Sequence, residues 1–335
     1  MSGKLIYKNE NSSITIKKFE LLFKNELISF LVNSEISELN SLEIFGNNLS
    51  NDNIKEKINL LIDDENIQKY ILENNKELIG LYLLKKSSFI SFIIKKEQRN
   101  KGYGKLGLFL LIKELSNIYQ NTSEYFFTIK KGNIWAHLIV LGNNAEKYDE
   151  KGEEMFYKIK KGNQIWLHRI GIDDMPKIMK ITTDAKNLLK QNGSLQWQQG
   201  YPDENTFIND INNNSLYGLY QNDELMAYGA FVYGKDINYV DIDGKWDIPA
   251  NDKDMAIHRV AVEQNQHGKK YGIKILKYGI VYAKKLGCVT VKVDTHKNNI
   301  PMQKSIIKSG FIYKGVVKIL RDKLDNLRFA YEIVL

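Results

Sequence analysis

The chain has 335 residues, 43% of them hydrophobic and 26% charged, which is the composition of a globular protein and excludes a disordered or fibrous one. The formal net charge is +8, yet there is no block of five or more like charges and no basic helix with interleaved aromatic side chains, so nucleic-acid binding is not predicted. A length of 335 residues leaves room for two ordinary domains.

The first half of the chain predicts strands that alternate with helices. The opening strand is ITIKKF (14–19), helical sequence follows it, and residues 69–85 form a hairpin pattern in which turn residues separate two apolar runs. The next strand leads into the turn QRNKGYG (98–104), which opens a strongly apolar helix. The half ends with a strand at 124–131, a helix from about Asn133 and a strand at 155–161.

The second half repeats this order around a second turn, QHGKKYG (266–272). Matching Arg99 to His267 places the two turns 267 − 99 = 168 residues apart, about half the chain. The matching strands, hairpin and helix start lie at 165–171, 216–234, 256–266, 288–296, Asn299 and 327–335. Helices between mixed strands predict an α/β (α+β mixed) sheet covered on both faces in each half. We predict two tandem domains, residues 1–162 and 163–335, joined at the charged, glycine-containing link KKGN (160–163).

Three features indicate a cytoplasmic protein. Cys288 is the only cysteine, so no intramolecular disulfide can form, as is usual in a reducing compartment. The first residues, MSGKLIYKNENSS, lack the apolar core of a signal peptide. The longest apolar run, LGLFLLI (106–112), is too short to span a bilayer, so no membrane partner is predicted. The sequence leaves the oligomeric state open.

Each turn follows a strand and opens a helix, a geometry that favours anion binding. The free N–H groups of a first helical turn point at one spot, the helix dipole favours negative charge there, and glycine lets the backbone approach closely. The dinucleotide-binding pattern is not satisfied, because Gly102, Gly104 and Gly107 are followed by no fitting acidic residue at the end of a second parallel strand. The phosphate-loop pattern GxxxxGK[ST] is absent as well.

The turn RNKGYG (99–104), placed after a hairpin and a strand, resembles the GNAT superfamily of acetyl-CoA-dependent N-acetyltransferases, whose signature is Q/R-x-x-G-x-G/A. The second turn keeps only Gly272 of this signature, with His267 in place of Gln/Arg and Lys270 in place of the middle glycine. The second half carries the resemblance in four other segments: HRVAV (258–262), KKLGC (284–288), VKVDTHKNNIPMQ (291–303) and KSGF (308–311). The resemblance implies two tandem GNAT-like acyl-CoA N-acyltransferase domains that use acetyl-CoA (CoA).

In this family the turn amides hold the diphosphate of CoA, and the strand before the turn pairs with its pantetheine arm. The cofactor-binding residues implied in the second half are Val260, Ala261, Val262, His267, Gly268, Lys269, Lys270, Tyr271, Gly272 and Asn299. Those implied in the first half are Phe92, Ile94, Arg99, Asn100, Lys101, Gly102, Tyr103, Gly104 and Asn133. A lysine at position 270 costs about 1 kcal/mol or more if its φ is positive. If the position is helical, the lysine costs little and adds charge beside the diphosphate. Either turn can therefore be the functional one, and the other a scaffold.

Acetyl transfer to an amine needs a base for the amine proton, and His258 is the first candidate, unless it is a histidine bonded inside the sheet. It lies nine residues before the turn, where the arylalkylamine N-acetyltransferases of the family carry a catalytic-type histidine, and a histidine titrates near pH 6.5. Strand alternation predicts that residues 258, 260 and 262 share one face. The first half has Ile90 at the equivalent place. Further candidate bases are Asp294 and His296, unless they cap the turn that follows them.

The general acid is missing from the pattern. Many family members carry a tyrosine about seven residues after the asparagine that opens the last helix, whereas this chain has Val140 and Ile306 at those places. Water is then left to protonate the thiolate, which is a tolerable leaving group.

Two segments of the second half are candidates for selecting the substrate. In LQWQQGYPDE (195–204), the side chains of Trp197, Gln198 and Tyr201 either form a wall of an amine pocket, or Trp197 fills the core. The segment 236–254 holds six aspartates against two lysines, which either attract a cationic amine or form a solvated flap.

These features predict an acetyl-CoA-dependent N-acetyltransferase in which a primary amine attacks the thioester directly, with catalysis in the C-terminal domain. The acceptor is a small-molecule amine or a peptide amine, and no metal site is predicted. Two alternatives stay open. Catalysis resides in the N-terminal domain, whose turn is intact, or the chain is a non-catalytic CoA-binding or regulatory protein.

Overall fold

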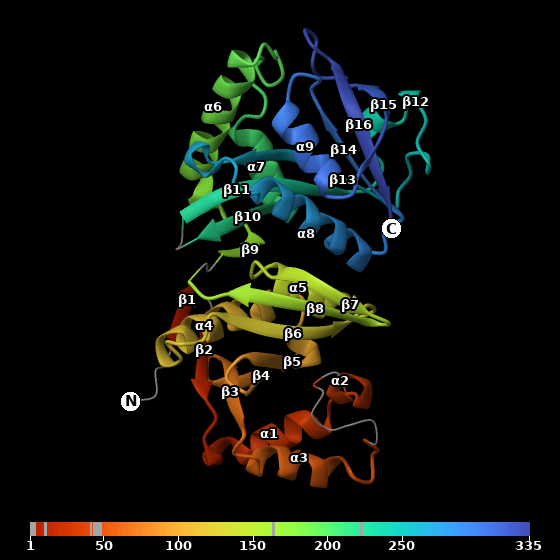
Figure 1. The fold of residues 1–335 in the computed structure, drawn as a ribbon. Helices are drawn as coiled ribbons and strands as arrows, with labels where there is room; N and C mark the ends of the chain where they lie inside the picture. The colour runs from red at the N-terminus through yellow and green to blue at the C-terminus, as the bar shows by residue number, and fades with distance from the viewer. Residues whose placement is uncertain (1–4, 10–11, 41, 43–48, 163–164, 222–223) are drawn as a thin grey trace. The chain divides into compact units, whose positions relative to one another are not determined.

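The computed structural model describes residues 5–9, 12–40, 42, 49–162, 165–221 and 224–335 (Figure 1). The chain divides into two compact units, residues 1–164 and 165–335. The predicted domain boundary falls beside residues 163 and 164, which lie outside the described residues. Within the described ranges, no helix combines the length and the apolar character that a membrane crossing requires.

The first unit contains an eight-stranded sheet in the order β1-β2-β3-β4-β5-β6-β8-β7. Its strands are β1 (Leu5–Asn9), β2 (Ser12–Lys18), β3 (Ile67–Asn74), β4 (Glu77–Lys85), β5 (Phe89–Ile94), β6 (Glu124–Lys130), β7 (Glu146–Lys151) and β8 (Glu154–Lys160). Its helices are η1 (Leu21–Phe23), α1 (Lys24–Val32), α2 (Ile36–Asn40), α3 (Ile54–Asp63), η2 (Lys96–Gln98), α4 (Tyr103–Ile118) and α5 (Ile134–Leu141). An apolar core that includes Leu27, Ile58 and Ile71 joins α1 and α3 to the sheet, because each element presents one apolar face.

The second unit contains a second eight-stranded sheet, in the order β12-β15-β16-β14-β13-β11-β10-β9. Its strands are β9 (Ile165–Arg169), β10 (Leu216–Gln221), β11 (Glu224–Tyr233), β12 (Ile242–Gly244), β13 (Asp254–Val262), β14 (Thr290–Thr295), β15 (Ile312–Lys318) and β16 (Leu327–Val334). Its helices are η3 (Ile172–Asp174), α6 (Met175–Gln191), α7 (Glu204–Asn212), η4 (Ile237–Tyr239), η5 (Gln264–Gln266), α8 (Tyr271–Lys285) and α9 (Ile300–Lys308). Helices α6 and α8 cover opposite faces, since Tyr228 of β11 contacts Thr182 of α6 while Gly229 lies against Ile275 of α8.

Seven strands of each sheet follow the same order. That order is β2-β3-β4-β5-β6-β8-β7 in the first unit and β9-β10-β11-β13-β14-β16-β15 in the second. In both sheets one described pair is parallel, β5 with β6 and β13 with β14. The predicted mixed α/β class is confirmed, with two separate mixed sheets.

The sequence pattern missed β1, β7, β12 and β15. For the last three, the reason is visible in the strand itself. β7 reads EKYDEK and is exposed along its whole length, so it has no apolar alternation. β12 spans only three residues. β15 contains Gly315 and a register irregularity, both of which interrupt a period of two.

Candidate functional site

A cavity of about 600 Å³ lies within the second unit. Strand β13, the turn before α8, the start of α9 and two loops line it. The residues of the sequence prediction that line it are Trp197, Tyr201, His258, Val260, Ala261, Val262, His267, Gly268, Lys270, Tyr271, Gly272, Asp294 and Asn299. Three predicted residues of this unit, Gln198, Lys269 and His296, are not among the lining residues.

One extra residue in β13 interrupts its pairing with β11. Tyr228 pairs with Ala261 and Ala230 pairs with His258, so a step of two residues on β11 matches a step of three on β13. Arg259 takes up the extra length with a φ of 52°, in the left-handed region. Its guanidinium anchors this bulge, because Nε lies 2.7 Å from Asp210 Oδ2 and Nη2 donates to Asp210 Oδ1 over 2.8 Å.

The bulge overturns the prediction that residues 258, 260 and 262 share one face. The register places His258 and Ala261 on the side of Tyr228, which is covered by α6. Val260 lies beside Gly229 and Val262 beside Gly272, which is the side covered by α8. The simple alternation failed because a bulge shifts the parity of every residue beyond it.

Strand β13 also separates from β14 along the cavity. Their pairing runs from Asp254 with Thr290 to Ala256 with Lys292 and ends there. The backbone from Ile257 to Val262 therefore faces the cavity instead of β14. Unpaired backbone N–H and C=O groups at such a place can pair with an extended ligand.

His258 sits between two carboxylates. Its Nε2 lies 2.7 Å from Asp236 Oδ2, and its Nδ1 lies 3.9 Å from Asp294 Oδ1. The Tyr239 hydroxyl donates to the same Asp294 oxygen over 2.7 Å, and the Tyr239 ring packs 5.8 Å from the imidazole. All of these groups are largely buried, with His258 only 10% exposed.

The charges around His258 fix its tautomer. Burial acts to raise the pKa of Asp236, but the hydrogen bond and charge of His258 and the bonds from Asn238 outweigh it and hold this pKa below its ordinary value. An ionised carboxylate only accepts hydrogen bonds, so Nε2 carries the proton. Whenever the ring is neutral, Nδ1 therefore bears its lone pair, on the side of Asp294. Burial and the charge of Asp294 keep the pKa of Tyr239 well above its usual value, so this hydroxyl stays a donor.

The acidic segment 236–254 is a folded part of the second unit. Tyr239 and Trp246 enter a buried cluster with Ala256, Val317 and Ala330. At the far end, the Lys292 ammonium lies 2.7 Å from Asp254 Oδ2 and 3.5 Å from Glu332 Oε1, with all three side chains at most 4% exposed. The interpretation as a solvated flap is therefore wrong for Asp236 and Asp254, which are fixed inside the unit.

The turn before α8 holds two residues in the left-handed region, Gly268 with a φ of 82° and Lys270 with a φ of 65°. Lys270 is the N-cap residue of α8, so the costlier of the two cases for this lysine holds, about 1 kcal/mol. A Cβ on Gly272 would find only Ser305 Oγ at 3.8 Å and Val262 Cγ2 at 3.9 Å. The cavity therefore reaches the first turn of α8.

The turn before α4 has the same backbone and different surroundings. Asn100 has a φ of 68° and Gly102 a φ of 84°, at the positions that match Gly268 and Lys270. Arg99 donates from Nε to Ile94 O over 2.9 Å, and the matching His267 Nε2 lies 3.2 Å from Val262 O. The rest of the Arg99 guanidinium bonds Glu38 through Nη1 and Nη2, at 2.5 and 2.8 Å.

Apolar side chains fill the space beside the turn before α4. A Cβ on Gly104 would lie 2.6 Å from Ile139 Cδ1 and 3.3 Å from Ile94 Cγ1. Strand β5 pairs with β4 in unbroken register from Phe89 to Ile94, without the bulge of β13. The Gly104 position is thus packed, whereas the matching Gly272 borders a cavity.

The other first-unit candidates make local contacts. Phe92 packs on the Tyr82 ring with centroids 5.7 Å apart, and Lys101 bonds Gln98 over 3.0 Å. The Tyr103 hydroxyl accepts from Asn74 over 3.2 Å. The remaining residue, Asn133, caps α5 by accepting from Ala136 N over 3.1 Å, as Asn299 caps α9 by accepting from Met302 N over 3.3 Å.

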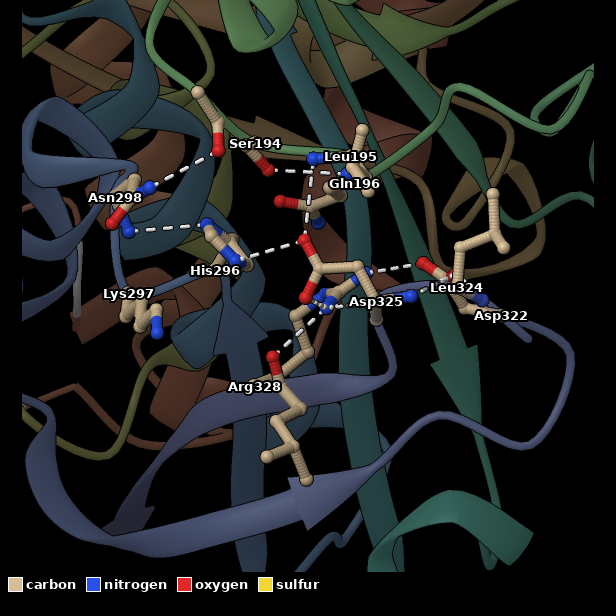
Figure 2. Close-up of polar contacts among 12 residues, drawn as sticks. Ser194, Leu195, Gln196, His296, Lys297, Asn298, Asp322, Leu324, Asp325 and Arg328 are labelled. Carbon is tan, nitrogen blue, oxygen red and sulfur yellow. Dashed lines mark hydrogen bonds and ion pairs between the residues drawn. The ribbon is translucent and has the colours of Figure 1, made fainter.

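His296 belongs to a polar network with Asn298, Asp325 and Arg328 (Figure 2). Its Nδ1 accepts from Asn298 N over 3.1 Å, and its Nε2 lies 3.0 Å from Asp325 Oδ2. Arg328 donates from Nη2 to Asp322 Oδ2 over 2.6 Å, and its guanidinium also lies beside the Asp325 carboxylate. Burial lowers the pKa of His296 below its ordinary value. Both ring nitrogens are thus used to hold loops together, as in the alternative in which this residue caps the turn.

Two of the three residues predicted as an amine wall line the cavity. Trp197 and Tyr201 line the cavity, and the Tyr201 hydroxyl accepts from Arg259 Nη1 over 2.7 Å. The Gln198 amide instead donates to Lys186 O over 2.9 Å and Gln196 O over 3.1 Å. The neighbouring Gln199 lines the cavity in its place.

Sequence reasoning did not identify the contacts that Asp236, Tyr239 and Arg259 make around His258. The acidic excess in 236–254 marked the right segment, but it could not single out Asp236, whose partner His258 lies 22 residues away. Arg259 sits inside a strand pattern, where nothing in the sequence indicates a bulge.

Residues 182–311 match the model of the acetyltransferase (GNAT) family. The second unit is similar to a GNAT-family acetyltransferase of Streptococcus agalactiae, with 27% identity, 51% of this chain and 96% of that chain covered, and a TM-score of 0.46. Half of this chain is also similar to the ribosomal-protein-alanine N-acetyltransferase of Brucella melitensis (15% identity, 50% and 99% covered, TM-score 0.39). A third similar structure is the spermidine N-acetyltransferase of Vibrio cholerae in complex with CoA and spermine (16% identity, 46% and 97% covered, TM-score 0.37). A search of curated proteins gives no match.

Proposed function

Because residues 182–311 match the model of the GNAT acetyltransferase family, we propose that the C-terminal unit transfers an acetyl group from acetyl-CoA to a primary amine. The observation that carries the proposal is the Asp236–His258 pair, which lines a cavity that also reaches the turn before α8. The family match covers residues 182–311, which include that turn but not the turn before α4.

The residues around the cavity fit acetyl-CoA. The first amides of α8 have no helical acceptor and point toward the turn, so they would hold the diphosphate. Lys270, Lys304 and Lys308 line this end of the cavity and would add positive charge. The backbone of β13 beyond the bulge would pair with the amides of the pantetheine arm, because β14 leaves it unpaired. Gly272 leaves this space open.

Acetyl-CoA would supply the thioester whose C–S bond breaks as the amine forms the C–N bond. His258 would accept the amine proton at Nδ1, the nitrogen left free by the bond from Nε2 to Asp236. Asp294 would orient the incoming ammonium group and the imidazolium that forms, since its Oδ1 lies 3.9 Å from Nδ1. Asp236 stabilises that imidazolium from the other side. The second proton that the nitrogen loses as the amide forms would go to the thiolate, directly or through water, so the proton count balances.

The first unit is proposed to be a GNAT-like domain that has lost its cofactor space. Its strand order and its left-handed turn residues match those of the second unit. Ile139 and Ile94 occupy the volume beside Gly104 that borders the cavity in the second unit. We therefore place catalysis in the C-terminal unit, and the first unit keeps the turn as part of its packing.

The test is the release of free CoA with a panel of primary amines, comparing His258→Ala with the unaltered protein. Loss of the base lowers kcat/KM by about 100-fold and removes the limb of the pH–rate profile that belongs to the imidazole. His168→Ala is the matched control, because this histidine stacks on Tyr220 at 4.2 Å and lies outside the cavity lining. An unchanged pH–rate profile in His258→Ala would remove His258 as the base. Absence of CoA release with every amine would remove the transferase proposal.

A further inference from the structure

Two of the arginines that line the cavity are neutralised by carboxylates. Arg259 is paired with Asp210, and Arg328 is paired with Asp322. The Asp322 carboxylate also accepts from Gln199 Nε2 over 3.2 Å and from Asp325 N over 3.1 Å. The anions of this loop are therefore already satisfied.

The third arginine is Arg321, which lines the cavity between β15 and β16. Its guanidinium carbon lies 3.9 Å from the centre of the Tyr201 ring, within the range of a cation–π contact. Among the described residues no carboxylate forms an ion pair with it. Its guanidinium N–H donors make no hydrogen bond to the described residues, so they are available to bind a planar anion.

Contacts connect Arg321 to the side of the cavity that holds the base. Tyr201, whose ring it contacts, accepts a hydrogen bond from Arg259, and Arg259 directly follows His258 in β13. Arg321 also lies near enough to Tyr239 for its charge to act on the pKa of that hydroxyl. The lysines that would hold the diphosphate come instead from the turn before α8 and from α9. Arg321 is thus placed to contact the acyl acceptor.

A group of opposite charge, the Asp294 carboxylate, lines the same cavity. Asp294 accepts from the Tyr239 hydroxyl, and the ionised Asp236 already holds the Nε2 proton of His258. With a neutral imidazole, Asp294 therefore retains a negative charge that attracts an ammonium group. An acceptor that binds both Arg321 and Asp294 carries an anionic group and an amine in one small molecule.

Resting on the proposed acetyl transfer, we propose that the acceptor is an amino acid or a similar small amine that carries a carboxylate, with Arg321 binding the carboxylate and Asp294 the ammonium group. The planar fork of an arginine matches the two oxygens of a carboxylate. A polycation lacks an anion for Arg321 and would place a positive charge beside it. The site therefore discriminates against polyamines.

The experiment compares amino acids with their carboxamides, which keep the amine and the side chain and lose only the negative charge. Both kcat/KM for CoA release and the dissociation constant from calorimetry are measured, for the unaltered protein, Arg321→Ala, Arg321→Lys and the neighbouring surface control Lys323→Ala. For the unaltered protein we expect the acids to exceed their amides by about 10- to 100-fold, the usual weight of a hydrogen bond to a charged group. Arg321→Ala removes this preference, Arg321→Lys restores part of it, and Lys323→Ala leaves it unchanged.

The two readouts separate the two proposals. Binding of amino acids that depends on Arg321, without CoA release, supports this inference and overturns the proposed transfer. CoA release with equal rates for acids and amides overturns this inference and supports the transfer. A preference for phosphoethanolamine over every carboxylate would overturn the assignment of a carboxylate. A loss of acetyl-CoA affinity in Arg321→Ala, with acceptor binding intact, would reassign Arg321 to the cofactor.

Discussion

The turns before α4 and α8 adopt the same backbone, and they differ in the side chains beside them. In both, the residues three and one before the helix start are left-handed, with φ values of 68° and 84° for Asn100 and Gly102, and of 82° and 65° for Gly268 and Lys270. The turn that matches the glycine signature is packed by Ile139 and held by Glu38. The turn that departs from the signature borders the cavity and follows a bulged strand.

This difference teaches that the signature reports a backbone shape, and that the same shape can occur with either packed or open surroundings. A binding site also needs a gap between strands, an open side of the helix and charges that a ligand can use. Those features come from residues distant in sequence, such as Ile139 in one unit and Lys308 in the other.

The largest effect is expected from reversing the charge at one turn and then the other. Lys270→Glu places a carboxylate where the diphosphate would bind, and like charges at this distance lower the affinity for acetyl-CoA by about 100-fold or more. Gly102→Glu puts the same side chain at the matching position of the first unit and leaves that affinity unchanged. Isothermal calorimetry with acetyl-CoA measures both. A larger loss of acetyl-CoA affinity in Gly102→Glu than in Lys270→Glu would place the cofactor site in the first unit.

A second, smaller effect separates packing from binding at the next glycine pair. Gly104→Ala brings a methyl group within 2.6 Å of Ile139 Cδ1, and such overpacking costs about 1–3 kcal/mol of unfolding free energy. Gly272→Ala meets only ordinary contacts at 3.8 Å and beyond, so it leaves the unfolding free energy nearly unchanged. Its methyl group instead enters the cavity, and we expect a loss of acetyl-CoA affinity of about tenfold. For both variants, denaturant unfolding measures the change in unfolding free energy and calorimetry measures the change in affinity for acetyl-CoA.

The smallest effect concerns the two loops that His296 joins through Asn298 and Asp325. The pKa of His296 is lowered by burial in the folded state, so the unfolded chain binds the proton first as the pH falls. Stability should be fully present above the ordinary histidine pKa of about 6.5 and decline as the pH falls below it. His296→Asn, which keeps an acceptor for Asn298 N, should flatten that decline between pH 7 and 5. Urea unfolding at several pH values tests this, and an equally steep decline in the variant would contradict it.

Local patterns predicted much of the fold. The hairpins, the strand–turn–helix segments and the asparagine helix starts each depend on a few neighbouring residues, and each is present in the structure. The edge strand β7 was missed because a fully exposed strand needs no apolar face. The second unit's family was recognisable from HRVAV and the segments after it, which fall within the matched residues.

Long-range features of the site could not be predicted in the same way. His258 was a candidate from its spacing alone, but its partner Asp236 approaches only because Tyr239 and Trp246 fold the acidic segment onto the sheet. The arrangement of faces in β13 depends on Arg259, and what fixes Arg259 is Asp210, 49 residues earlier. Arg321 stands out because the other arginines of the cavity have carboxylate partners, and only a structure reveals those pairs.

Lys270 has a consequence for anyone who engineers this protein. A redesign guided by stability or by the family signature would replace this left-handed lysine with glycine first, because the change relieves about 1 kcal/mol of backbone strain. The same change deletes a positive charge at the end of the cavity where the diphosphate would bind. The variant that looks more like its family would melt later and hold its cofactor more weakly.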